Sequence, residues 1–132
     1  MEGLFERGVE EFNSQLFFEA HDTWEELWRE TRGPQRLFYQ GLIQTAVGFY
    51  HLSNGNFRGA CSQFGKALVK LSEYAPRHDG IETHLLIERL KECHRDAERL
   101  RDGKGGLFDK ARIPRIQFDV LRNTQKQIDG IT

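Results

Sequence analysis

Cysteine, surplus charge of either sign and long apolar runs are all scarce in this 132-residue sequence, and each scarcity excludes a class of protein. The two cysteines, Cys61 and Cys93, lack the spacing of a zinc or redox motif, and the acidic N-terminus is unlike a secretory leader, so we expect a reducing, cytoplasmic setting. The formal net charge of −1, without a run of five like charges, argues against nucleic-acid binding. No apolar run approaches the roughly 18 residues of a membrane span, so we expect no membrane segment.

The charges that are present are unevenly distributed. Residues 1–31 hold nine acidic and two basic side chains, whereas residues 32–132 hold eleven acidic and seventeen basic ones, a balance of −7 against +6. Solvated helix faces explain such a pattern, and so does self-association between unlike ends. The sequence therefore leaves a monomer and a homo-oligomer both open.

Apolar residues recur at helical spacing almost throughout, interrupted by short stretches with glycine, proline or asparagine. The 38% hydrophobic content, with 10 Phe, is enough for one core. The sequence therefore predicts an all-α fold, a compact bundle of about five helices in helical hairpins with an irregular C-terminal tail. The expected helices cover about residues 2–13, 16–31, 34–52, 57–75 and 80–101. The third is apolar on most sides and is expected at the centre.

The breaks between these helices carry recognisable signals. Asn56 is a natural N-cap for the fourth helix, and Asp79 with Glu82 resembles a capping box for the fifth. We expect residues 1–102 to form the bundle domain, and residues 103–132 to form a flexible Gly-rich break, "GKGG", followed by a docked or partly disordered tail. Because Pro114 disfavours helix for the residue before it, "IPRI" is expected to lie extended against the bundle.

The sequence also contains an internal echo. A shift of 40 residues places Phe17 on Phe57, Ala20 on Ala60 and Trp24 on Phe64. Two related hairpins would produce this pattern, and so would the common spacing of any two helical hairpins.

The stretch "FFEAHDTWEELW", residues 17–28, places His21 and Glu25 inside the apolar arc of the second helix. The two are one turn apart, a spacing at which an imidazole and a carboxylate can share a proton, a metal ion or a polar ligand. Three polar side chains of the third helix lie within about 40° on one face and are expected opposite them. The predicted interior pocket contains Gln40, Gln44 and His51 from that face, with walls of Trp24, Trp28, Tyr39 and Tyr50.

Three interpretations of this pocket stay open. His21 and Glu25 can be a hydrogen-bonded core pair that fixes helix packing, part of a pocket for a small polar ligand, or part of a site for a divalent metal. A metal would take His21, Glu25 and either Asp22 or His51. His78, His84 and His94 are expected at the surface. No phosphate-binding glycine loop and no nucleophile elbow appears, so no further cofactor is indicated.

The order of residues in this half of the sequence resembles the bacterial and archaeal domain-of-unknown-function 309 family. The similarity covers about residues 5–75 and includes Glu19, Ala20, His21, Trp24, Glu25, Trp28, Gly41, Gln44, Tyr50 and His51. The resemblance implies an all-helical bundle and no established activity, although members sometimes carry the label of predicted metal-dependent hydrolase. We therefore expect a small protein whose pocket binds a small ligand or a partner's polar group; the alternative is a metal-dependent hydrolase using His21 and Glu25.

Overall fold

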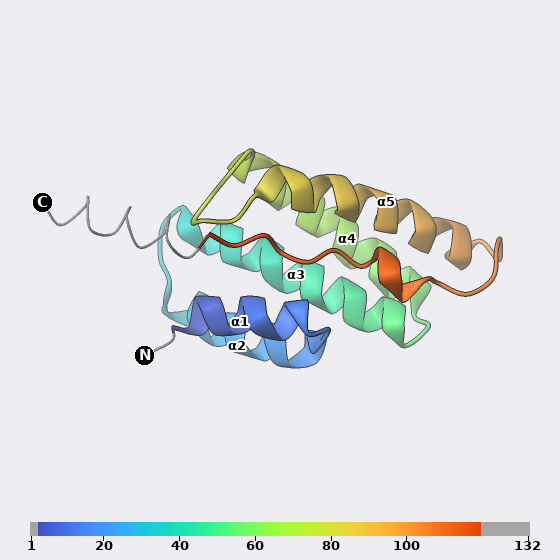
Figure 1. Cartoon of the computed structure of the whole chain (residues 1–132), viewed down its shortest axis with the longest axis horizontal. Coiled ribbons are helices and arrows are strands. Elements are labelled where there is room, and N and C mark those ends of the chain that lie inside the picture. The colour runs from blue at the N-terminus through green and yellow to red at the C-terminus, as the bar shows by residue number, and fades with distance from the viewer. Residues whose placement is uncertain (1–2, 120–132) are drawn as a thin grey trace, which may run out of the picture.

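The computed structural model describes residues 3–119, which form five helices that pack in sequential order (Figure 1). The helices are α1 Leu4–Asn13, α2 Phe17–Glu30, α3 Gln35–Ser53, α4 Phe57–Leu71 and α5 Thr83–Arg101, with 3-10 turns η1 Ser72–Tyr74 and η2 Lys110–Arg112. Each helix contacts the next along the chain, and α3 with α4 forms the most extensive pair. In the described part of the chain the only β-type pairings are isolated bridges, so the predicted all-α bundle is confirmed. None of the helices described is both long and apolar enough to cross a membrane.

The core is built around α3, as its apolar pattern predicted. Phe38, Leu42, Ala46 and Phe49 of this helix have no exposed surface. The ring of Phe49 packs edge-on against Phe64 of α4, with the ring centroids 4.8 Å apart. The central helix thus joins the two ends of the bundle through aromatic contacts, which contribute packing energy beyond the area that they bury.

The helix boundaries agree with the sequence prediction within a few residues, but the predicted capping box of α5 is wrong. Helix α5 begins at Thr83, and Asp79 lies before it with a positive φ of 49°. The Asp79 carboxylate instead accepts a hydrogen bond from the Gln35 side chain at the start of α3. In contrast, the predicted cap of α4 is confirmed, because Asn56 Oδ1 accepts from Gly59 N at 3.0 Å.

The two hairpins α1–α2 and α3–α4 repeat one design at an interval of 40 residues. Gln15 and Gly55 occupy the same place in their loops, and both have a positive φ, 61° and 76°. The backbone hydrogen bond from Leu16 N to Glu11 O has its counterpart from Asn56 N to His51 O, both 2.8 Å long. The echo in the sequence is therefore also an echo in loop geometry and hydrogen bonding.

A segment that we call the strap, residues 109–119, runs extended beyond η2 across the face formed by α1, α3 and α5 (Figure 1). Ile113 and Ile116 of the strap are buried, at 9% and 3% exposure, which agrees with the extended "IPRI" predicted from Pro114. The remainder of the predicted tail, residues 120–132, lies outside the described residues. The division of the chain into domains at residue 102 stays a prediction.

Candidate functional site

Helix α2 places His21 between two carboxylates. His21 Nδ1 lies 3.2 Å from Asp22 Oδ1, and Nε2 lies 2.9 Å from Glu25 Oε2. The other oxygen of Glu25 accepts a hydrogen bond of 2.9 Å from Arg29 Nη2, one turn further along. Four side chains of one helix therefore form a continuous polar row, Asp22, His21, Glu25 and Arg29.

This row lies at the surface and not in the interior where the sequence prediction placed it. The side chains of His21 and Glu25 are 25% and 31% exposed. The residues that turn directly into the core are Ala20 and Trp24, which have no exposed surface. His21 and Glu25 occupy the edge of the apolar arc of α2, where it meets α3, so they border grooves between the two helices.

The first groove is polar and has a volume of about 230 Å³. It is lined by His21, Glu25, Trp28, Gln40, Ile43 and Gln44. Two of its polar atoms, Trp28 Nε1 and Gln44 Oε1, are buried without a hydrogen-bond partner among the described residues. An unpaired buried donor or acceptor costs on the order of 1–3 kcal/mol, so this groove offers one unused donor and one unused acceptor.

Trp28 itself is held in place from outside the groove. The Arg36 guanidinium carbon lies 3.8 Å from the centroid of the Trp28 ring, within the range of a cation–π contact. The contact fixes the indole plane, and with it the direction of the unpaired N–H.

The second groove is apolar and has a volume of about 160 Å³. It is lined by Phe18, His21, Val47, Tyr50 and His51. The ring of Phe18 lies 5.6 Å from that of Tyr50 and 5.8 Å from that of His21, between centroids. Phe18 is 50% exposed, which is unusual for a phenylalanine in a small helical bundle. His21 borders both grooves, so an apolar and a polar compartment meet at its ring.

Three residues of the predicted pocket do not take the place expected. Trp24 is a core residue whose Nε1 donates to Phe5 O at 3.2 Å, and Tyr39 packs against the Phe5 ring. His51 borders only the apolar groove, and its Nδ1 lies 3.2 Å from Asn56 Nδ2.

The carboxylate and imidazole groups that could hold a metal ion are His21, Asp22 and Glu25. One ligand atom from each lies within 4.8 Å of the other two, and among the described residues this is the one such group. Of the two third ligands considered from the sequence, the structure therefore favours Asp22 over His51. One imidazole with two carboxylates is a donor set that zinc, manganese and iron all accept.

Sequence reasoning missed several contacts at the site and elsewhere. Phe18, Val47 and Ile43 line the grooves, yet apolar residues on an amphipathic helix give no signal that separates a groove from the core. Arg29 follows Glu25 at the i,i+4 spacing, a signal that was available. His78 was expected at the surface, but it is half-buried, with Nε2 2.6 Å from Gln35 Oε1 and its ring against Phe38.

Comparison with protein families identifies the half of the molecule that contains the grooves. Residues 5–62 match the model of a family described as Domain of unknown function (DUF309). The match begins in α1 and ends within α4, so it includes every residue of both grooves and excludes the strap. A search of the curated proteins found no match to this chain. The resemblance noted in the sequence is thus confirmed, and over residues 5–62 the chain belongs to the DUF309 family.

Proposed function

We propose that the α2–α3 face binds a small ligand, or a polar group of a partner, with an apolar part in the Phe18–Tyr50 groove and a hydrogen-bonding end in the groove of Glu25 and Gln44. The observation that carries this proposal is the pair of buried, unpartnered atoms Trp28 Nε1 and Gln44 Oε1. A bound group that accepts from the indole and donates to the amide oxygen would satisfy both. A primary carboxamide, or any group with a donor beside an acceptor, has this chemistry.

The position of His21 supports a single binding site over two separate ones. Its ring borders the apolar groove on one side and the polar groove on the other. Together the two grooves have a volume of about 390 Å³, from 230 and 160 Å³, which is within the range of small-molecule sites. A pair kept only for packing would not require the unpaired atoms or the exposed Phe18 nearby.

A second candidate is the metal-dependent hydrolase suggested by the sequence, and the cluster of His21, Asp22 and Glu25 favours it. An ion would take one imidazole nitrogen and one oxygen from each carboxylate, and it would replace Arg29 as the partner of Glu25. In such an enzyme His21 and Glu25 would hold the ion or activate a water molecule. Both candidates concern the same face, and we propose a cytoplasmic location for either, in agreement with two free thiols.

The two candidates are separated by one set of variants. Thermal shift measured with a panel of small carboxamides, amines and carboxylates tests the ligand site on untagged protein, and the same assay with Zn²⁺ and Mn²⁺ tests the metal site. Gln44→Leu should abolish a ligand response, and Gln63→Leu on α4, outside both grooves, should leave it unchanged.

The metal candidate makes the opposite demand. Arg29→Ala frees one oxygen of Glu25 and should strengthen metal binding, while Asp22→Asn should weaken it. A stoichiometric metal that is insensitive to Gln44→Leu would favour the hydrolase. A ligand response that survives Gln44→Leu and Phe18→Ser would overturn the proposed ligand site.

A further inference from the structure

The strap is held by contacts that an extended peptide from another chain could make equally well. Asn13 of α1 uses its side-chain amide on the strap backbone: Nδ2 donates to Ile116 O at 3.1 Å, and Oδ1 accepts from Ile116 N at 2.7 Å. Near the end of the described strap, Glu82 N donates to Gln117 O and Asp119 N donates to Gly80 O. These bonds recognise extended main chain and do not depend on the side chains of the strap.

Side-chain recognition comes from two aliphatic residues and one cation. Ile113 and Ile116, three positions apart, are buried against the bundle. Arg112 Nε lies 2.7 Å from Asp96 Oδ2 of α5, and Arg112 O accepts a weak hydrogen bond of 3.6 Å from Cys93 Sγ. The pattern accepted by the face of α1, α3 and α5 is therefore a cation, an aliphatic residue, and a second aliphatic residue three positions later.

The tether of the strap does not fix it to the bundle. Between the end of α5 and Asp109 the chain has no helix or strand, Gly103 and Gly105 have φ values of 75° and 82°, and Leu107 is 99% exposed. A short flexible tether of this kind presents the strap at an effective concentration on the order of millimolar, without adding specific contacts.

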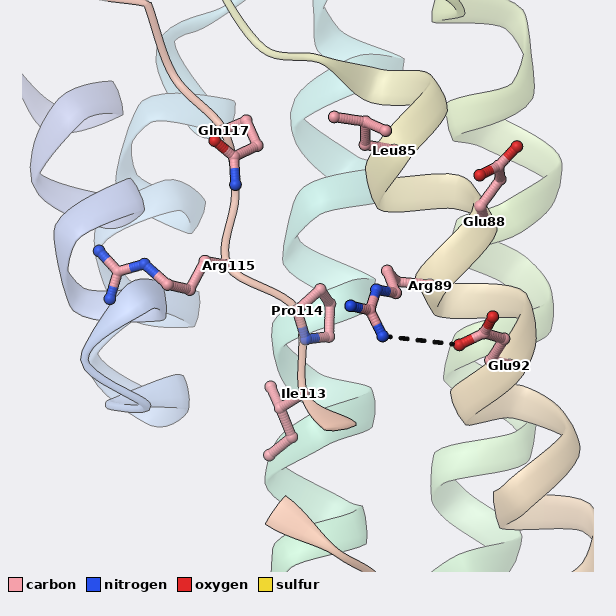
Figure 2. Close-up of a pocket in the computed structure, with 8 residues that line it drawn as sticks. All are labelled: Leu85, Glu88, Arg89, Glu92, Ile113, Pro114, Arg115 and Gln117. Carbon is pink, nitrogen blue, oxygen red and sulfur yellow. Dashed lines mark ion pairs between the residues drawn. The ribbon is translucent and has the colours of Figure 1, made fainter. Parts of the chain in front are cut away.

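The strap also leaves part of the face unfilled. A groove of about 460 Å³ remains between it and α5, lined on the helix side by Leu85, Glu88, Arg89 and Glu92. Figure 2 shows Leu85 and Arg89 reaching from α5 toward Pro114, while Arg115 extends in the opposite direction. Glu88, Glu92 and Asp96 recur every four residues of α5 and lie on one side of it, and of these three Asp96 is the one that pairs with a strap residue.

We propose that the face of α1, α3 and α5 is a docking groove for an extended, basic and aliphatic segment of a partner protein, and that the strap occupies this groove in cis and competes with the partner. The row of carboxylates on α5 selects a cationic segment, and the unfilled groove supplies contacts that the strap does not use. A partner needs these extra contacts because it competes against a tethered occupant. This inference is independent of the α2–α3 site.

The test uses the full chain and a labelled peptide with the sequence of residues 107–119, LFDKARIPRIQFD, followed by fluorescence anisotropy. One variant has twenty Gly-Ser residues inserted between Gly105 and Gly106, which leaves every contact of the strap and the groove intact. Lengthening the tether from about 6 to about 26 residues lowers the effective concentration of the strap roughly tenfold, so the apparent affinity for the peptide should rise by about the same factor. Asn13→Ala in this background should reduce it, and a scrambled peptide should not bind.

A second variant empties the groove directly. Ile113→Ser with Ile116→Ser removes both aliphatic anchors, and the matched control is Arg115→Ser at an exposed strap position. The free peptide should bind the double variant more tightly than the control. The alkylation rate of Cys93, which lies under the strap, should increase in the double variant and fall again when the peptide is added, with Cys61 as the internal reference.

Two results would overturn the proposal. The first is equal peptide affinity for the wild-type, long-tether and double-variant chains, because binding would then occur elsewhere. The second is a long-tether chain that keeps its helical circular dichroism but does not bind the peptide at millimolar concentration. In that case the strap is a fixed part of the fold.

Discussion

The indole ring of Trp24 lies directly against Gly8. A Cβ built on Gly8 would come within 2.0 Å of Trp24 Nε1, the atom that donates to Phe5 O. Gly8→Ala should therefore displace the indole, break this buried hydrogen bond and lower the free energy of unfolding by roughly 2–4 kcal/mol, as expected for overpacking with loss of a buried bond. Urea denaturation followed by tryptophan fluorescence measures the change.

The matched control for this substitution is Gly65→Ala on α4. Gly65 is also a helical glycine, but a Cβ there would meet only His94 Cε1 at 3.9 Å, an ordinary contact. Alanine has a higher helix propensity than glycine, so this variant should gain about 0.5–1 kcal/mol. If Gly8→Ala were as stable as Gly65→Ala, the close approach of α1 to α2 would not be a constraint on the fold.

The helices and the repeat could be predicted from sequence because their signals are local. Glycine, proline and asparagine mark the breaks, and apolar spacing marks the helices, within a window of a few residues. The start of α5 could not be predicted this way. Asp79 has the spacing of a cap, but its partner is Gln35, which is 44 residues away, and only the packing of the 75–82 loop on α3 decides between the two.

The site was predicted in direction but not in depth. A helical wheel gives the angle at which His21 and Glu25 leave α2, and this angle is correct for the α2–α3 boundary. It does not say how deeply the boundary is buried, which depends on the side chains that α3 places opposite. Trp24 shows the same limit: it shares the apolar arc with His21, yet it points to the centre of the core.

Replacing the carboxylate of Glu25 should affect stability very little. The Glu25 side chain is 31% exposed and its partner Arg29 is 68% exposed, and ion pairs at such positions contribute about 1 kcal/mol or less. Glu25→Gln should therefore change the free energy of unfolding by less than about 1 kcal/mol, similar to the exposed control Glu26→Gln. Guanidinium denaturation of both variants measures this, and a loss above about 2 kcal/mol for Glu25→Gln alone would identify a structural pair instead.

The thiol of Cys93 should make the fold sensitive to alkaline pH. Burial, with a smaller effect of the Asp96 carboxylate, raises the pKa of Cys93 from 9.0 to about 12. Between these values the unfolded chain loses the proton and the folded chain keeps it, so this contribution to stability is complete below pH 9 and declines as the pH rises toward 12. The decline is about 1.4 kcal/mol per pH unit for one group.

Comparison with Cys93→Ala isolates this effect from tyrosine and lysine titration. The free energy of unfolding should fall more steeply between pH 8 and pH 10 in the wild-type chain than in the variant. Parallel pH profiles for the two proteins would mean that Cys93 ionises in the folded chain as easily as in the unfolded one, and that the strap does not seal it.

Ending the chain at residue 102 tests the division into a bundle domain and a tail. The truncation removes Ile113 and Ile116 from their buried positions, and each contributes roughly 1.5–3 kcal/mol by burial. We expect the truncated chain to keep its helical circular dichroism, because the five helices contact one another without the strap, but to unfold at a clearly lower urea concentration. The reference is a chain that ends at Asp119, which retains every described contact of the strap. A truncated chain that melts with the reference would show that the strap adds no stability, and one that is unfolded in buffer would show that residues 1–102 are not a domain by themselves. An intermediate result, helical but less stable, is what an exchangeable strap requires, because the groove must stay formed while it is empty.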